Sequence, residues 1–386
     1  MSVETVTLGC RLNFAESETI AQSAPAGEDW IVVNSCAVTN EAVRQTRQAI
    51  RRAHRRQPDA RILVTGCAAE LDPRSFAALP GVSRVTGNSS KLSSLAANDV
   101  MAPSGLLANV KSFVAVQTGC DHRCTFCSIW QARGASVALP FEAIRQAVAR
   151  EIDRGAKEIV LTGVDITDYS GGLGQLCQRL IAAEPRLKRL RLSSLDSVEI
   201  DDALFELIAG EPRLMPHFHL SLQSGDDMIL KRMRRRHTRA EAVLTVERIK
   251  TARADATIGA DLIAGFPTET EEMALNSLKL LDDCDVVAAH IFPFSARPNT
   301  PAARMPQLER ELVKARASRL RESAAERRAH WLESMAGTVQ PVLVEGDGIG
   351  HTDNFAPVAL PAASRGQSGQ ARITGSDGSH LTAVWA

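Results

Sequence analysis

The chain has 386 residues, of which 44% are hydrophobic and 23% are charged, and its 45 basic residues balance 45 acidic ones. These values are ordinary for a globular protein of two or three domains and exclude disordered, collagen-like and disulfide-scaffold classes. No apolar run reaches the ~18 residues of a membrane span, and the first residues lack the pattern of a secretory signal. We therefore expect a cytoplasmic protein without membrane contact, in which local basic patches would have to bind any polyanion.

The first 100 residues alternate strand and helix signals. Runs rich in Val, Ile and Thr predict strands at residues 3–8, 31–34 and 61–65. A helix is predicted between the last two strands, from residue 41 to the proline at position 58. Strands separated by helices indicate a parallel sheet, which we expect to form a domain of residues 1–100.

Three cysteines follow closely after these predicted strands: Cys10, Cys36 and Cys67. The carboxyl ends of parallel strands meet at one edge of a sheet, so we expect these thiols to converge there although they are far apart in sequence. A chain that is not exported keeps its thiols reduced, which favours metal binding over disulfides. Three converging thiolates could hold an iron–sulfur cluster.

Six further strand-like runs begin 29 to 45 residues apart, at residues 113–117, 158–162, 189–193, 218–222, 258–264 and 288–294. Each interval has room for a helical crossover, so the runs predict a complete or partial barrel of parallel strands over residues 106–335. The polar stretch 89–112 before them is predicted to be a linker, and a charged helix at about 307–333 ends the segment. Four short strands at 339–344, 356–360, 370–374 and 381–385 predict a small β-barrel over residues 336–386.

A second cysteine triplet lies just beyond the first barrel strand. Cys120, Cys124 and Cys127 are spaced C-x3-C-x2-C, on the face of the barrel where catalytic residues gather. Three thiolates could hold a 4Fe–4S cluster with one iron open to a small molecule; alternatively, His122 could complete a structural zinc site. The remaining cysteines, Cys177 and Cys284, lie in helical stretches and are predicted to be buried hydrophobic residues.

The segment Gly-Cys-Asp-His-Arg-Cys-Thr-Phe-Cys at residues 119–127 resembles the signature of radical S-adenosylmethionine (SAM) enzymes. Residues 7–10, 34–36 and 65–67 resemble the cysteine segments of the methylthiotransferase domain, and the C-terminal segment resembles the TRAM domain. The chain is therefore similar, over essentially its whole length, to the radical SAM methylthiotransferase family.

This resemblance implies an enzyme with two 4Fe–4S clusters and SAM. One cluster would be held by Cys120, Cys124 and Cys127, and an auxiliary cluster by the three N-terminal cysteines. In the implied reaction, a 5′-deoxyadenosyl radical from SAM removes hydrogen from adenine C2, and a methylthio group from the auxiliary cluster takes its place. A sulfur source and an electron donor of the flavodoxin or ferredoxin type are implied as partners.

The family has three branches, which act on isopentenyladenosine in tRNA, on threonylcarbamoyladenosine in tRNA, and on an aspartate of a ribosomal protein. Residues 36–41, Cys-Ala-Val-Thr-Asn-Glu, with the following arginines, resemble the threonylcarbamoyladenosine branch, whose target lies next to the anticodon at position 37. Residues 235–238 read Arg-Arg-His-Thr where the family commonly has Arg-Arg-Tyr-Thr. A zinc-containing RNA-binding protein without catalysis is the alternative from a different class.

Two further sets of residues are candidates for binding. Residues on or after barrel strands could contact SAM or substrate instead of serving the core or turns: Phe126, Gly163, Gln223, Asp261, Gly265 and Phe292. A stripe on the predicted helix at 41–57 and a later basic run could bind tRNA phosphates instead of forming solvated surfaces: Arg44, Arg47, Arg51, Arg55, Arg235 and Arg236.

Overall fold

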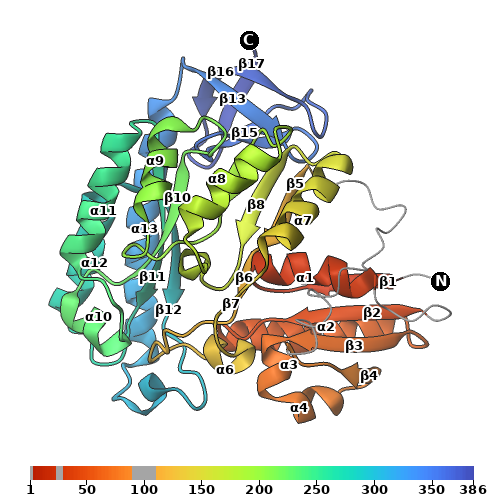
Figure 1. Ribbon diagram of the computed structural model, residues 1–386. Coiled ribbons are helices and arrows are strands. Elements are labelled where there is room, and N and C mark those ends of the chain that lie inside the picture. The colour runs from red at the N-terminus through yellow and green to blue at the C-terminus, as the bar shows by residue number, and fades with distance from the viewer. Residues whose placement is uncertain (1–2, 23–28, 89–109) are drawn as a thin grey trace.

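The computed structural model describes residues 3–22, 29–88 and 110–386 (Figure 1). Most of the predicted linker 89–112, and with it the expected domain boundary near residue 100, lies outside these residues. A parallel sheet, an open barrel and a small closed barrel follow one another along the chain, so the predicted α/β fold class is confirmed. No helix in the described ranges has the length and apolar character that crossing a bilayer requires.

The N-terminal sheet has four parallel strands in chain order: β1 (Val3–Thr7), β2 (Trp30–Ser35), β3 (Arg61–Gly66) and β4 (Val82–Val85). The first three strands were predicted, whereas the short, partly exposed β4 gives little sequence signal. Four helices connect or follow the strands: α1 (Arg11–Gln22), α2 (Asn40–Arg56), α3 (Cys67–Leu71) and α4 (Pro73–Ala77). Every residue of β2 is buried, as expected for a central strand covered on both faces.

Helix α2 begins and packs as its sequence predicts. The hydroxyl of Thr39 accepts a hydrogen bond from the backbone N–H of Ala42 at 3.1 Å and so caps the first turn. Ala49, Ile50 and Ala53 are buried, and the last two join the core of the N-terminal sheet. The arginines of α2 therefore lie on its partly or fully exposed sides.

The central segment is an open barrel of six parallel strands in chain order: β5 (Lys111–Ala115), β8 (Glu158–Thr162), β9 (Leu190–Leu192), β10 (His217–Gln223), β11 (Thr257–Ala264) and β12 (Val286–Pro293). Isolated parallel bridges join β9 and β10 and make the wall continuous. The crossover helices pack outside it: α7 (Phe141–Asp153), α8 (Leu173–Ala183), α9 (Asp202–Gly210), α10 (Asp227–Met233), α11 (Arg239–Ala252) and α12 (Glu271–Asp283). The predicted charged helix is α13 (Arg310–Ser334), which lies against β11 and β12.

The second cysteine triplet lies in a loop between two very short antiparallel strands, β6 (Gln117–Thr118) and β7 (Val137–Ala138). Helix α6 (Ile129–Arg133) follows the triplet and contacts α3 of the N-terminal sheet. The loop therefore lies at the carboxyl ends of the barrel strands, beside the N-terminal sheet (Figure 1).

The C-terminal strands close into a five-stranded barrel: β13 (Val339–Val344), β14 (Ile349–Thr352), β15 (Pro357–Ala359), β16 (Ser368–Ser376) and β17 (Leu381–Trp385). Strand β14, Ile-Gly-His-Thr, was not predicted because its polar residues resemble a turn. The loop after β14 docks on the amino ends of the central strands. Phe355 stacks on His217 at 4.9 Å between ring centroids, and the carbonyl of Asn354 accepts a hydrogen bond from Thr257 at 2.7 Å. The small barrel thus covers the end of the central barrel opposite the cysteine loop (Figure 1).

Candidate active site

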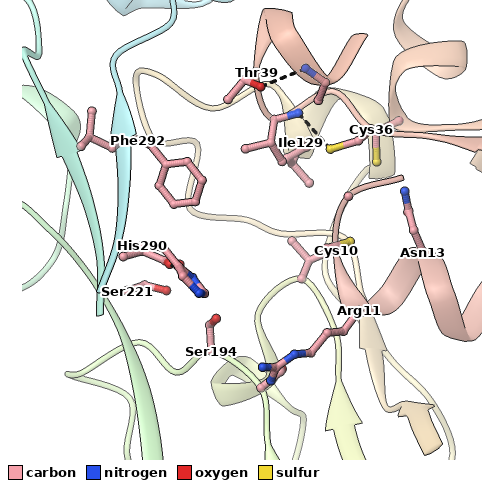
Figure 2. Close-up of a pocket in the computed structure, with 18 of the residues that line it drawn as sticks. Cys10, Arg11, Asn13, Cys36, Thr39, Ile129, Ser194, Ser221, His290 and Phe292 are labelled. Carbon is pink, nitrogen blue, oxygen red and sulfur yellow. Dashed lines mark hydrogen bonds and ion pairs between the residues drawn. The ribbon is translucent and has the colours of Figure 1, made fainter. Parts of the chain in front are cut away.

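The three N-terminal cysteines meet at the carboxyl edge of the sheet. Cys36 directly follows β2, Cys67 directly follows β3, and Cys10 lies three residues after β1. All three line a single cavity of about 630 Å³, whose opposite wall is formed by the central barrel (Figure 2). The sequence prediction placed these thiols at one sheet edge, and the structure brings them together there.

Two glycines allow this approach. Gly9 has a φ of +96°, and a Cβ added to it would lie 2.6 Å from the Sγ of Cys36. Gly66, also at +96°, would place a Cβ 2.3 Å from the carbonyl oxygen of Ser35. Any larger residue would push neighbouring strand ends apart, because such distances are well below contact. The two glycines therefore set the spacing of the three thiols.

The second triplet is held by backbone contacts. The N–H of Cys120 donates to the carbonyl of Gly134 at 3.1 Å, and the N–H of Ile129 donates to the Sγ of Cys127 at 3.3 Å. The guanidinium of Arg235 lies 3.7 Å from the Sγ of Cys124. Arg235 therefore places a cationic hydrogen-bond donor beside this sulfur.

The spacing of the sulfur atoms tests which metal group fits. Four thiolates on one zinc ion lie about 3.8 Å apart, whereas the thiolates around a 4Fe–4S cube are spread more widely. Among residues 3–22, 29–88 and 110–386, no three cysteine sulfurs lie within 4.8 Å of one another. Both triplets therefore fit an iron–sulfur cluster better than a single zinc ion.

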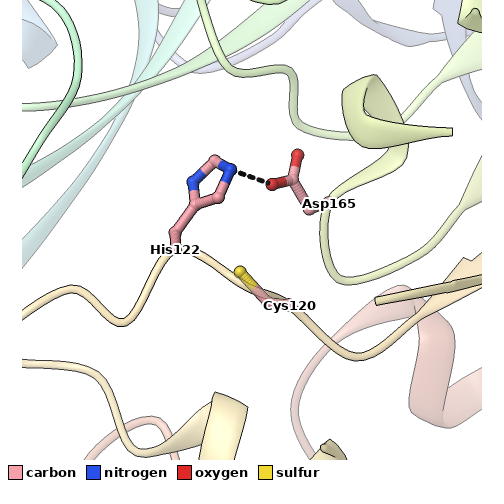
Figure 3. A group of neighbouring side chains, drawn as sticks. All are labelled: Cys120, His122 and Asp165. Atoms are coloured by element: carbon pink, nitrogen blue, oxygen red, sulfur yellow. Dashed lines mark ion pairs between the residues drawn. The ribbon is translucent and has the colours of Figure 1, made fainter. Parts of the chain in front are cut away.

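His122, the fourth ligand of the alternative zinc site, faces carboxylates instead of Cys124 and Cys127. Its Nε2 lies 3.1 Å from Asp165 and 3.5 Å from Glu199, although Cys120 is also close (Figure 3). The hydrogen bond to Glu199 raises the pKa of His122. Because its ring turns toward these carboxylates, His122 does not complete a set of four ligands with the three cysteines, and the geometry argues against that zinc site.

Burial determines the protonation of the free thiols. It raises the pKa of Cys36 to about 11 and that of Cys120 to about 12. These thiols keep their protons in the absence of a metal group, and a bound cluster would displace them. The two sets of cysteines thus suit a cationic iron group to which their thiolates bind as ligands.

A buried arginine joins the two halves of the site. Arg133, at the end of α6, donates through Nε to the Sγ of Cys67 at 3.1 Å. Its two terminal nitrogens bond to Glu16 at 2.6 Å and to Asn13 at 2.7 Å, both on α1. A residue from the second cysteine loop thereby fixes the position of an N-terminal cysteine and neutralises a buried carboxylate.

Comparisons with known proteins agree with this two-part site. Residues 114–281 match the model of the radical SAM superfamily, and residues 2–87 match that of the uncharacterized protein family UPF0004. The threonylcarbamoyladenosine tRNA methylthiotransferase MtaB of Rickettsia prowazekii is 42% identical over 99% of this chain and 97% of that protein. The chain belongs to the radical SAM methylthiotransferase family. This confirms the family that the sequence of the cysteine segments predicted.

Other members of this family are less similar. MtaB of Thermotoga maritima is 32% identical over 89% of this chain and 86% of that protein. The tRNA-2-methylthio-N(6)-dimethylallyladenosine synthase of Erythrobacter litoralis is 31% identical with the same coverage. The solved radical SAM methyltransferase TsrM of Kitasatospora setae, at 14% identity and a TM-score of 0.56, covers 86% of this chain and 73% of its own and shows a shared fold.

As a radical SAM methylthiotransferase, the protein is an enzyme that uses SAM and two 4Fe–4S clusters. Five of the six residues predicted to bind SAM or substrate line the cavity beside the cysteines: Phe126, Gly163, Gln223, Asp261 and Phe292. Gly265 is not among the residues that line it. An added Cβ there would contact the side chain of Val313 at 2.8 Å, so Gly265 allows α13 to approach β11 closely.

Asp261 is part of a hydrogen-bonded group on the cavity wall. Its carboxylate bonds to His219 at 2.8 Å and to His290 at 3.0 Å. Although burial opposes ionisation, these two histidines hold the pKa of Asp261 well below its usual range. The carboxylate of Asp261 thus already has two hydrogen-bond partners within the wall.

The predicted stripe of α2 is only partly free. Arg44 bonds to Glu41 at 2.7 Å, and Arg47 donates to the hydroxyl of Ser75 at 3.0 Å. Arg51 and Arg55 are exposed. The other end of α2 lines the cavity with Thr39 and Ala42, so the helix leads from the surface to the site.

Two arginines of the second predicted RNA patch, Arg235 and Arg236, pair with groups near the second cysteine loop. Arg235 is buried between Asp196, at 2.8 Å, and Cys124. Arg236 is half-exposed and forms an ion pair with Glu199. Arg235 thus contacts the second cysteine loop and Asp196, and the RNA-binding role of both arginines stays a prediction.

Two site residues escaped the sequence analysis. Arg11, directly after Cys10, points into the cavity (Figure 2), and Arg133 lies six residues after Cys127. Adjacency to a cysteine could have indicated Arg11. No sequence signal distinguishes Arg133 from the 45 basic residues, because its partners on α1 are more than 100 positions away. Cys177 and Cys284 are buried, as predicted.

Proposed function

We propose that the protein transfers a methylthio group to C2 of N6-threonylcarbamoyladenosine at position 37 of tRNA, next to the anticodon. The observation that carries this proposal is the 42% identity to a threonylcarbamoyladenosine tRNA methylthiotransferase over nearly the full length of both chains. The relatives named for the dimethylallyl substrate reach only 31%. The proposed substrate is therefore that of the MtaB relatives.

The two cysteine triplets are the proposed ligands. Cys120, Cys124 and Cys127 would hold the cluster that binds SAM, and the auxiliary cluster would be held by Cys10, Cys36 and Cys67. The fit of both triplets to a group wider than one metal ion supports this assignment. When bound, these groups and SAM supply the radical that takes hydrogen from adenine C2 and the methylthio group that replaces it.

The chain itself supplies the cavity between the triplets. Phe126 and Phe292 provide apolar walls that would exclude water and contact the adenine ring. Gly163, directly after β8, lines the cavity, and it allows the chain to pass close to Gln117, because an added Cβ would lie 2.8 Å from the carbonyl oxygen of that residue. A nucleotide must leave the anticodon stack to reach this cavity, as for other enzymes that act on a base.

The proposed reaction requires tRNA, an electron donor and a sulfur source as partners. The exposed arginines of α2, Arg51 and Arg55, would contact tRNA phosphates, because the same helix borders the cavity with Thr39. A flavodoxin- or ferredoxin-type donor would supply electrons, and a separate source would replace the sulfur consumed in each turnover. A tRNA substrate places the reaction in the cytoplasm.

Deletion of the gene tests the proposal. Nucleosides from the tRNA of such a strain should lack the 2-methylthio form of threonylcarbamoyladenosine and retain its precursor. Re-expression of the wild-type chain should restore the product, and a chain with Ala at Cys10, Cys36 and Cys67 should not. Unchanged threonylcarbamoyladenosine, with loss of methylthio from isopentenyladenosine or from a ribosomal protein, would assign the chain to another branch.

A further inference from the structure

One cation in the cavity has no partner. Arg11, the first residue of α1, extends toward the wall formed by Ser194 (Figure 2). Within the part of the chain that the structure describes, its guanidinium makes no hydrogen bond and no ion pair. The other arginine of the cavity, Arg133, is fully bonded to Glu16 and Asn13.

No carboxylate among the described residues pairs directly with Arg11, although Glu158, Asp261 and Glu345 attract it from a distance. Glu158 and Glu345 already pair with other cations, and an arginine remains charged at physiological pH. The carboxylate on the adjacent wall, Asp261, is already bonded to two histidines. A half-buried guanidinium without a counter-ion is unfavourable, and an anionic ligand would relieve this cost.

The proposed substrate carries such an anion. In threonylcarbamoyladenosine, threonine is attached through its amino nitrogen, so its carboxylate and hydroxyl remain free. The dimethylallyl group of the related substrate is a hydrocarbon with neither function. Arginine binds a carboxylate through two parallel hydrogen bonds, and the hydroxyls of Ser194 and Ser221 line the same part of the cavity.

We propose that Arg11 binds the carboxylate of the threonylcarbamoyl group and thereby selects this nucleoside over one with an uncharged substituent. This inference rests on the proposed function and adds a specificity residue to it. A site built to pair a charged group discriminates strongly against ligands that lack it, because its own charge is then left unpaired.

SAM also carries a carboxylate, so the two sources must be separated. Arg11 directly follows Cys10 of the N-terminal triplet, whereas SAM is expected at the open iron held by Cys120, Cys124 and Cys127. This position favours the nucleoside carboxylate. If Arg11 binds the carboxylate of SAM, its replacement weakens SAM binding in the absence of RNA. If Arg11 binds the carboxylate of the nucleoside, SAM binding is unchanged and RNA binding is weakened.

The test measures binding of anticodon stem-loop RNAs to the anaerobically reconstituted holoenzyme. One RNA carries threonylcarbamoyladenosine, and a second carries its carboxamide, which has the same shape without the charge. The proteins are wild type, Arg11→Gln, Arg11→Lys and the control Arg150→Gln, which removes an exposed cation on α7. SAM affinity without RNA is measured for each protein.

We expect wild type and Arg150→Gln to bind the acid about 10- to 100-fold more tightly than the carboxamide, as for a charged hydrogen-bonded pair. Arg11→Gln should lose this preference by weakening only the acid, and Arg11→Lys should keep part of it. SAM affinity should not change. If wild type shows no preference, the inference is overturned even where Arg11→Gln fails to fold.

Other results would assign Arg11 a different role or would overturn the proposed function. Equal weakening of both RNAs by Arg11→Gln would indicate a phosphate or structural contact, and weakened SAM affinity would assign Arg11 to the SAM carboxylate. If wild type methylthiolates threonylcarbamoyladenosine while Arg11→Gln keeps the preference, only the role of Arg11 is wrong. If wild type cleaves SAM but never modifies this nucleoside, the proposed function itself fails.

Discussion

At the scale of single residues, the site is organised by arginines whose partners are sulfur and carboxylate atoms. Arg133 and Arg235 each place a guanidinium beside a cysteine of one triplet. Hydrogen bonds to the sulfurs of a cluster are among the factors that set its reduction potential. The cysteines would bind the clusters, and the two arginines would position a cysteine of each triplet and influence the reduction potential.

Replacement of Arg133 by Met tests this role. The change removes the donor to Cys67 and leaves Glu16 buried without its main counter-ion, which should cost about 3–5 kcal/mol of stability. We expect a lower thermal midpoint and a more negative reduction potential of the auxiliary cluster. As a control, Arg145→Met removes an exposed ion pair with Glu142 and should change neither. An unaltered potential in a folded Arg133→Met protein would contradict the role assigned to this residue.

At the scale of elements, the strand ends determine the geometry of the auxiliary triplet. Gly66→Ala would force the end of β3 away from Ser35 and displace Cys67. We expect about half of the iron of wild type after reconstitution, with SAM cleavage retained, because the second triplet is untouched. Gly171→Ala is the matched control, since Gly171 also has a positive φ but no atom near its Cβ position. Full iron content in Gly66→Ala would show that this contact does not set the site.

The exposed arginines of helix α2 are predicted to bind tRNA. Arg51→Gln with Arg55→Gln should weaken tRNA binding and lower the salt slope by roughly 0.7–0.9 for each lost phosphate contact. Arg150→Gln with Lys157→Gln removes two exposed cations at another place and should leave the slope unchanged. Filter binding across a salt series measures the tRNA affinity and its salt dependence for both variants. If the α2 variant keeps the wild-type slope, α2 is only a solvated surface.

Sequence patterns predicted the elements well where a strand is buried and regularly spaced. All six central strands and the edge position of Cys10, Cys36 and Cys67 follow from such patterns. The patterns failed for short, polar β14, and they did not show that Gly265 lies against α13. They also could not show that Arg235 pairs with Asp196, since a charge run does not reveal which of its members meets a carboxylate from a distant part of the chain.

At the scale of the whole molecule, the two ends of the central barrel have different tasks. The carboxyl ends face the N-terminal sheet and the cavity, and the amino ends are covered by the C-terminal barrel. The ring of Phe355 seals that second interface, with the cations of Lys111 and Arg191 4.9 and 4.8 Å from its centre. This end contributes stability without reaching the cysteines.

Phe355→Ala tests this separation. Loss of the ring contacts should cost about 2 kcal/mol or more, lower the thermal midpoint and expose the C-terminal barrel to limited proteolysis. Iron content and SAM cleavage should stay near wild type, because the altered loop lies at the opposite end of the strands. Val384→Ala, at an exposed position of β17, is the control. Loss of either cluster in Phe355→Ala would show that the two ends are coupled.

The most direct test of the central claim is modification of a defined RNA by the reconstituted protein. An anticodon stem-loop carrying threonylcarbamoyladenosine is incubated anaerobically with the holoenzyme, SAM, a reductant and sulfide, and its nucleosides are analysed by mass spectrometry. The account predicts the 2-methylthio derivative with wild type and none when either cysteine triplet is replaced by Ala. A product on an isopentenyladenosine stem-loop instead, or protein that holds zinc and no iron, would contradict it.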